Sequence, residues 1–178
     1  SSWAGHDINY LGVGGYLHTS ERGVGGKPPI PGATVADSAA GGMQAVIAIL
    51  AALFERDRLG KGTYLDVSVA EGVLSLTSLY IDEHLATGAV PGPGHDVLTG
   101  RYAFYDIYEC ADGGWVSVGA IEPHFYRNLC QALDCTQWVE HQYDDTVQDA
   151  VRRDFSAAFR KRDRDAWVAD LAPNDTCV

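Results

Sequence analysis

Three positions of this sequence carry side chains of the kind that general acid–base catalysis uses. His6 and Asp7 are neighbours in "GHDINY", Asp37 stands directly before the longest apolar stretch with helical spacing, and Glu122 directly precedes Pro123. A histidine and a carboxylate of moderate pKa can remove a proton from a bound substrate and return one to it. His6, Asp37 and Glu122 are therefore the candidate catalytic residues.

Each of these positions also has a purely structural interpretation. A hydrogen-bonded pair near the end of a strand would account for His6 and Asp7. Asp37 stands where a helix N-cap is expected, and Glu122 where a cap or a first-turn carboxylate would stabilise the helix dipole. From the residues alone, both interpretations stay open.

Composition predicts a globular, acidic chain. Its 178 residues are 46% hydrophobic, enough to bury the core of one domain or of two small ones. The formal charge is −11, with 13 Lys and Arg against 24 Asp and Glu, which disfavours nucleic acids and anionic membranes as partners. The longest apolar run, residues 45–54, is shorter than a membrane span, and no signal-peptide pattern is visible.

The cysteines favour a reducing compartment. Four are present, and they form neither a CxxC motif nor the spacing of a disulfide framework: Cys110, Cys130, Cys135 and Cys177. We expect reduced thiols, no metal site and a cytoplasmic protein.

Periodicity predicts an α/β segment in the first half of the chain. Residues 1–36 are rich in Gly and Pro and are expected to form a long loop after one short segment. A helix is predicted from Asp37 to "RLGKG", a strand in "TYLDVSV" at 63–69, and a second, mostly apolar helix over 70–88. This succession of helix, strand and helix is typical of α/β packing.

The second half predicts a small α+β domain. "RYAFYDIYECADGGWVSVGA" is expected to form two strands joined by an Ala-Asp-Gly-Gly turn. A helix with Pro123 in its first turn follows, and then one or two amphipathic helices between 144 and 172. The predicted division is 1–88 for the α/β part, 89–101 for a linker and 102–178 for the small domain.

Several stretches resemble the family III CoA transferases of the CaiB/BaiF type, and within them the α-methylacyl-CoA racemase branch. They are "GHDINY", "ADSAAGGMQAVIAILAALFER", "GKGTYLDVSVAEG", "YDIYECADGGWVSVGAIEPHFY" and "DRDAWVADLAPNDTCV". "GHDINY" and "VGAIEP" are specific for that branch, whereas the Asp at the head of a helix is general to the family. Relatives are about twice as long, which implies that this chain is an internal or C-terminal piece of a Rossmann-like large domain plus the small domain.

The resemblance assigns roles to the candidate residues. It implies a racemase that inverts the carbon next to a thioester, with His6 and Asp37 as the two bases and Glu122 as the carboxylate that hydrogen-bonds the histidine. It also implies that an acyl-CoA is the substrate, with no separate cofactor, and that the CoA-binding stretch consists of Gly5, His6, Asp7, Ile8, Asn9 and Tyr10. We expect the backbone N–H groups of Asp37 and Ser38 to be free to stabilise an enolate oxygen.

The resemblance further implies lipid and fatty acid metabolism and an interlocked homodimer. Its active sites would lie between the large domain of one chain and the small domain of the other, and His6 and Asp37 would meet Glu122 either within one chain or across the interface. The arginine-bearing half that holds the CoA phosphates in relatives has no counterpart in these residues. We therefore expect the 178 residues alone to be inactive and to bind CoA poorly.

Two alternatives remain open. "ADSAAGG" is closer to the transferase branch, in which the aspartate is a nucleophile that forms a mixed anhydride. Transferases lack a histidine at the position of His6 and "IEP" at 121–123, which favours the racemase. The third possibility is a truncated module without catalytic activity.

Overall fold

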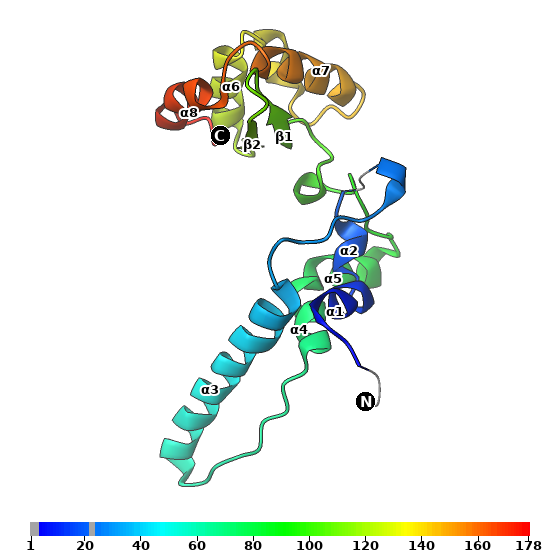
Figure 1. The fold of residues 1–178 in the computed structure, drawn as a ribbon, viewed down its shortest axis with the longest axis vertical. Helices are drawn as coiled ribbons and strands as arrows, with labels where there is room; N and C mark the ends of the chain where they lie inside the picture. The colour runs from blue at the N-terminus through cyan, green and yellow to red at the C-terminus, as the bar shows by residue number, and fades with distance from the viewer. Residues whose placement is uncertain (1–3, 22–23) are drawn as a thin grey trace. The chain divides into compact units, whose positions relative to one another are not determined.

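The computed structural model describes residues 4–21 and 24–178, which form two compact units (Figure 1). The first unit extends to Pro93 and the second comprises Gly94–Val178. The division between them falls inside residues 89–101, the segment expected to be a linker. The chain is mixed α/β, mostly helical with a small sheet.

All regular structure of the first unit is helical within the residues that the structure describes. Its elements are α1 (Asp7–Val13), α2 (Tyr16–Thr19), a 3-10 turn at Val24–Gly26, the π-helix η2 (Val35–Met43), α3 (Gln44–Leu59), α4 (Val69–Leu76) and α5 (Ser78–Thr87). The long loop predicted for residues 1–36 thus contains two short helices. Leu11, Ala36, Ala40 and Val73 form the buried centre of this unit.

The strand predicted at 63–69 is wrong. Residues 61–68 have no regular structure, and Val69 already belongs to α4. An alternating pattern stabilises a strand only when a neighbouring strand takes up its backbone hydrogen bonds, and none pairs with this segment within the described residues. Ser68 instead caps α4, because its Oγ accepts the N–H of Glu71 at 3.3 Å.

The second predicted helix, over 70–88, is divided into α4 and α5 at Thr77. The hydroxyl of Thr77 is buried and lies within hydrogen-bonding distance of the carbonyl oxygens of Val73 and Leu74 in its own helix and of Gly14 beside it. Such bonds to the preceding turn bend a helix. α5 ends at Gly88, whose φ of 76° is the left-handed conformation that glycine adopts without strain.

The π-helix and α3 together form one long helix, Val35–Leu59, which Figure 1 shows running away from α1, α4 and α5. By length and composition alone this helix could cross a membrane, since the mean hydropathy of its most apolar window is 1.5. Core helices of soluble proteins meet the same two criteria. Its large apolar side chains are exposed, among them Val46, Ile47, Leu50 and Phe54. Among the residues of the first unit that the structure describes, none covers that face of α3.

The second unit is an antiparallel hairpin packed against helices, as predicted. The hairpin strands are β1 (Tyr105–Glu109) and β2 (Trp115–Gly119), and the helices are α6 (Pro123–Ala132), α7 (Gln148–Phe159) and α8 (Arg164–Leu171). Short 3-10 turns lie at Val97–Thr99, Thr136–His141 and Ala172–Asn174. Alternation along the strands buries Tyr108, Val116 and Val118 against α7 and α8 and leaves Ile107 and Trp115 exposed.

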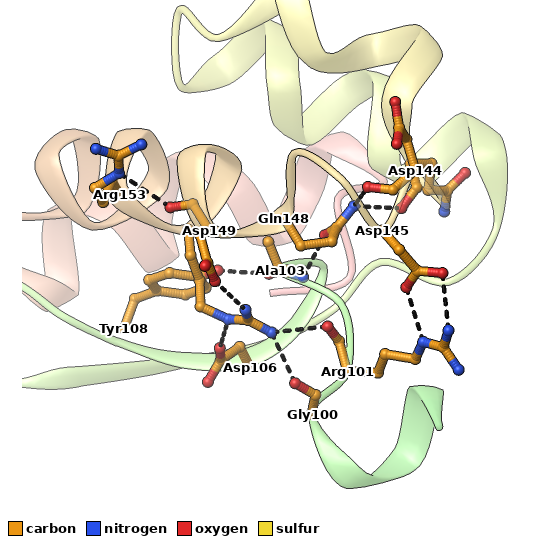
Figure 2. A network of polar contacts seen from close by, with 12 residues as sticks. Gly100, Arg101, Ala103, Asp106, Tyr108, Asp144, Asp145, Gln148, Asp149 and Arg153 are labelled. Atoms are coloured by element: carbon orange, nitrogen blue, oxygen red, sulfur yellow. Dashed lines mark hydrogen bonds and ion pairs between the residues drawn. The ribbon is translucent and has the colours of Figure 1, made fainter. Parts of the chain in front are cut away.

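Polar contacts fix the beginning of the hairpin to α7 (Figure 2). Arg152 of α7 donates to Asp106 Oδ2 at 2.8 Å and to the carbonyl oxygen of Gly100 at 2.7 Å. Arg101 forms a two-pronged ion pair with Asp145, with both N···O distances 2.8 Å. Because guanidinium groups match carboxylates in this geometry, these contacts set the direction in which the chain enters β1.

All four cysteines lie among the described residues, and none is in a disulfide. Three are buried and Cys177 is exposed. Burial raises the pKa of the Cys130 thiol to about 12, which keeps it protonated at neutral pH.

Candidate active site

His6 lies immediately before α1, in an extended conformation with φ −120° and ψ 175°. Its backbone is held by a reciprocal pair of bonds with Asn9. The N–H of His6 donates to Asn9 Oδ1 at 3.0 Å, and the N–H of Asn9 donates to the carbonyl oxygen of His6 at 2.9 Å. This arrangement follows the capping-box pattern and fixes where the helix begins. His6 itself is exposed, so a ligand can reach it.

Asp37 lies in the first turn of η2 and is exposed. The helix begins with Thr34 as its N-cap residue, so the prediction that Asp37 is the N-cap is wrong. The reason is tertiary packing: Ala36 and Ala40 are fully buried, and the helix must already be formed at Ala36 to place both methyl groups in the core. Local π-helical geometry of this kind is frequent at functional sites.

A hydrogen bond joins the two candidate segments. Asp7 Oδ1 accepts the backbone N–H of Asp37 at 2.9 Å, although the two residues are 30 positions apart. The carboxylate satisfies one of the N–H groups that a helix start leaves without a partner, and its charge suits the positive end of the helix dipole. Since Asp7 directly follows His6, this bond brings the His6 segment and the Asp37 turn together.

The same bond corrects the expectation of free N–H groups. The N–H of Asp37 is taken by Asp7, and the N–H of Ser38 donates to the carbonyl oxygen of Thr34 at 2.8 Å. Neither is available for an enolate oxygen. The helix begins two residues earlier than the sequence indicated, so the N–H of Ser38 already lies within the regular hydrogen-bonding pattern.

Close packing behind the Asp37 turn fixes its position. Gly72 of α4 approaches the backbone of Ala40 so closely that an added Cβ would lie 2.6 Å from the carbonyl carbon of Ala40. Gly41 has more room, because the nearest atom to a Cβ there would be a side-chain carbon of Val69 at 2.9 Å. Gly72 was not among the predicted site residues, and the signal that could have found it is a glycine inside an apolar helical pattern, which usually has a packing reason.

The predicted CoA-binding stretch, Gly5–Tyr10, forms the entry to α1. Gly5 packs on the ring of Tyr10, where a Cβ would lie 3.0 Å from a ring carbon. Tyr10 is half-buried against the core of the first unit, whereas Ile8 and Asn9 are exposed. The role of this stretch in CoA binding stays a prediction.

Glu122 belongs to the second unit and occupies the N-cap position of α6, with φ −71° and ψ 138°. Its side chain makes no capping hydrogen bond and is exposed. Pro123 at the first helical position has no N–H to satisfy, so one of the donors at this helix end is absent. The Glu122 carboxylate is therefore accessible from solvent and is not used to cap α6.

Comparison with known proteins shows the family. The family model described as CoA-transferase family III matches residues 1–178. The chain belongs to CoA-transferase family III. It is 35% identical over 181 residues to the α-methylacyl-CoA racemase of Mus musculus, a match that covers 100% of this chain and 47% of the relative. The human α-methylacyl-CoA racemase is also 35% identical, over 177 residues.

Other relatives in CoA-transferase family III are named as transferases. The succinyl-CoA–D-citramalate CoA-transferase of Chloroflexus aurantiacus is 34% identical over 116 residues, which are 63% of this chain and 28% of the relative. The chain spans about half the length of the racemases it matches.

Solved structures agree on the fold. A crystal structure of the hypothetical protein Rv3272 from Mycobacterium tuberculosis superposes with a TM-score of 0.77 at 22% identity, over 97% of this chain and 46% of that one. A CaiB/BaiF family protein from Brucella suis gives a TM-score of 0.72 at the same identity, over 96% and 46%. The fold is thus shared with a solved protein of the CaiB/BaiF family.

Proposed function

We propose that these residues belong to an enzyme that interconverts the (2R) and (2S) forms of 2-methylacyl-CoA thioesters. The observation that carries the proposal is the bond from the Asp37 N–H to Asp7 Oδ1, since it brings a histidine segment and an aspartate turn together. The 35% identity to α-methylacyl-CoA racemases along the whole chain supports the same conclusion. Acyl-CoA is then the substrate, and no separate cofactor is needed.

The reaction requires two acid–base groups on opposite faces of the substrate. One of His6 and Asp37 removes the proton at C2, and the electron pair of the broken C–H bond moves through the thioester carbonyl to give a planar enolate. The other group, protonated at the start, donates its proton to the opposite face of C2, and the carbonyl reforms. In the reverse direction the two residues exchange roles. Each role requires a side chain that the substrate can reach, and the side chains of His6 and Asp37 are both exposed.

In the enzyme that we propose, Glu122 is the carboxylate that accepts a hydrogen bond from the imidazole of the catalytic histidine, either within one chain or across the dimer interface. This bond would fix the tautomer of the histidine and stabilise the imidazolium that forms when His6 takes the proton. The proposal includes a homodimeric enzyme acting in fatty acid metabolism, as the resemblance implies, and located in the cytoplasm, as the cysteine pattern favours.

A CoA transferase is the second candidate function. In that case Asp37 would attack the thioester carbonyl and form a mixed anhydride, with CoA thiolate as the leaving group. The match to the transferase of Chloroflexus aurantiacus favours this reading, and the exposed carboxylate of Asp37 is compatible with it.

Isotope exchange distinguishes the two functions. The complete protein that contains these residues is incubated with a (2R)-2-methylacyl-CoA in D2O. Racemisation gives both epimers with deuterium at C2. Transfer of CoA to an added carboxylic acid, without deuterium at C2, would refute the racemase and make Asp37 the nucleophile.

Variants separate the roles of the three residues. We expect His6→Ala and Asp37→Asn to abolish racemisation, because each removes a proton-transfer group, and Glu122→Gln to leave weak activity, because it removes only a partner of the histidine. Normal turnover of Asp37→Asn would mean that this residue serves only the helix end.

A further inference from the structure

Two glutamines in the second unit are buried, and their carboxamides bond to backbone groups. Gln142 is 8% exposed and Gln148 is 5% exposed. Burying a carboxamide without partners is unfavourable, because the group gives up its hydrogen bonds to water, so a buried glutamine persists only where its hydrogen bonds are made. Neither residue was singled out in the sequence, where both lie in the polar stretch "HQYDDTVQDA". What they hold in place is therefore informative.

Gln142 holds the two peptide groups that lead to Glu122. Its Nε2 donates to the carbonyl oxygen of Ile121 at 2.8 Å and to that of Ala120 at 3.2 Å. The hydroxyl of Tyr143 adds a third donor, to the same Ile121 oxygen at 3.3 Å. Three donors from two adjacent side chains thus converge on the backbone immediately before the candidate carboxylate.

The remaining polar groups of that backbone are also bonded. The N–H of Ala120 donates to the carbonyl oxygen of Phe104 at 2.9 Å, and the N–H of Ile121 donates to that of Gly119 at 2.8 Å. Every backbone donor and acceptor of Ala120 and Ile121 therefore has a partner. Glu122 follows directly, and Pro123 restricts the conformation of the residue before it to the extended region that Glu122 adopts.

Gln148 holds the segment that carries Gln142. Its Nε2 lies 3.0–3.3 Å from the carbonyl oxygens of His141, Gln142 and Asp144. Its Oε1 accepts the N–H of Ala103 at 3.0 Å, and Figure 2 shows Gln148 between Ala103 and Asp144. Gln142 is thus itself anchored to the first turn of α7 and to the chain that enters β1. The two glutamines form one continuous connection from α7 to the start of α6.

We propose that Gln142 is a positioning residue for Glu122. It fixes the backbone from which the Glu122 side chain projects, while the carboxylate itself remains accessible and without a capping bond. The inference rests on the proposed function, in which Glu122 orients His6. Displacing a group of the active site by about 1 Å can lower a rate by 10²-fold. A carboxylate that acts through a single hydrogen bond therefore requires a backbone that is held in place.

The test is a double-mutant cycle in the complete protein that contains these residues. Gln142→Met keeps the length of the side chain but removes the donors, and we expect kcat to fall roughly tenfold to hundredfold with KM nearly unchanged. If Gln142 acts through Glu122, the double variant with Glu122→Gln is no slower than Glu122→Gln alone. Gln131→Met, an exposed position of α6, is the matched control and should leave kcat unchanged.

Tyr143→Phe provides a second variant with little risk to folding, since it removes one hydroxyl from an exposed side chain and keeps the ring. It should lower kcat by less than Gln142→Met, again without further loss in the Glu122→Gln background. It decides the question if Gln142→Met does not fold.

Three outcomes overturn the inference. The first is an unchanged kcat in Tyr143→Phe and in Gln142→Met, if the latter folds. The second is a double variant whose kcat falls by the product of the two single losses, which would mean that Gln142 does not act through Glu122. In both cases Glu122→Gln itself still lowers kcat, so the proposed role of Glu122 stands. Full activity of Glu122→Gln instead removes the proposed role of Glu122, and the role of Gln142 with it.

Discussion

Replacing Gly72 by alanine tests whether close packing positions the Asp37 turn. A Cβ at residue 72 would lie 2.6 Å from the carbonyl carbon of Ala40 and 2.9 Å from its Cα, where ordinary contacts begin at 3.4 Å. The shortfall of 0.8 Å at the carbonyl carbon cannot be relieved by a side-chain rotation, because the opposing atoms are backbone. The carbonyl oxygen of Ala40 would lie closer still to the added Cβ, so the helices α4 and η2 must move apart by more than that distance.

Such overpacking typically costs about 1–3 kcal/mol. Since η2 carries Asp37 three residues before Ala40, the same displacement moves a proposed proton-transfer group by a distance that can lower a rate by roughly 10²-fold. We expect Gly72→Ala to lose both stability and kcat. Urea unfolding followed by circular dichroism measures the first, and deuterium exchange at C2 in the complete protein measures the second.

The matched control is Gly62→Ala. A Cβ at residue 62 meets nothing within 4 Å, and the residue does not adopt a positive φ. It should be neutral or slightly stabilising, since alanine reduces the entropy of the unfolded chain. If Gly72→Ala behaved like Gly62→Ala in both measurements, the close approach of α4 to the Asp37 turn would be refuted.

Three further predictions follow from single contacts. Asp7→Ala removes the acceptor of the Asp37 N–H and should lower the free energy of unfolding by about 0.5–2 kcal/mol, whereas Asp7→Asn should lower it by less. Equal stability of Asp7→Ala and wild type in urea would contradict the bond. At neutral pH a thiol reagent should label Cys177 rapidly and the other three cysteines slowly, because burial raises the pKa of those three thiols. Cys177→Ser should abolish the fast phase of labelling. A fast phase that persisted would mean that another thiol is accessible. Hydrogen bonds from Thr146 lower the pKa of Asp144 in the folded protein. The stability that the ionised carboxylate contributes is therefore present above the unfolded pKa near 3.8 and is lost as the pH falls through the folded pKa. Asp144→Asn should weaken the decline in stability below pH 3.8, and an unaltered decline would exclude a contribution from Asp144.

The parts of the fold that local rules determine could be predicted from the sequence. The hairpin has alternating strands and a turn glycine, Gly113, with a φ of 75°. The start of α6 has Pro123 at its first position, and the left-handed Gly60 ends α3. Each of these signals lies in a few neighbouring residues, and those residues themselves determine the turn or the helix end. The local sequence is therefore sufficient to predict it.

The errors arose where distant residues decide the structure. The pattern at 63–69 alternates as a strand does, but a strand also requires a neighbour, which periodicity does not supply. The start of η2 depends on the burial of Ala36 and Ala40 against α4, so the residue types around Asp37 could not fix it. The bond from Asp7 to Asp37 spans 30 positions, and nothing in either segment alone indicates it.

The three candidate residues share one structural feature, which explains how a helix end can serve chemistry. Each lies at the start of a helix, where backbone N–H groups lack partners within the helix and side chains usually supply them. Here neighbours satisfy or remove that requirement. Asn9 takes the N–H of His6, Asp7 takes the N–H of Asp37, and Pro123 removes the donor that would follow Glu122.

Because neighbouring residues supply the acceptors for these helix starts, the candidate side chains stay exposed at fixed positions. A carboxylate oxygen that capped its own helix would have to give up that bond before it could accept one from a catalytic partner in the same position, at a cost of about 0.5–2 kcal/mol. This arrangement avoids that cost for Glu122, which makes no capping bond, and leaves Asp7 to stabilise the helix that carries Asp37. Of the conspicuous carboxylates, Asp7 stabilises a helix start, whereas the side chains of Asp37 and Glu122 stay exposed for the roles that we propose for them.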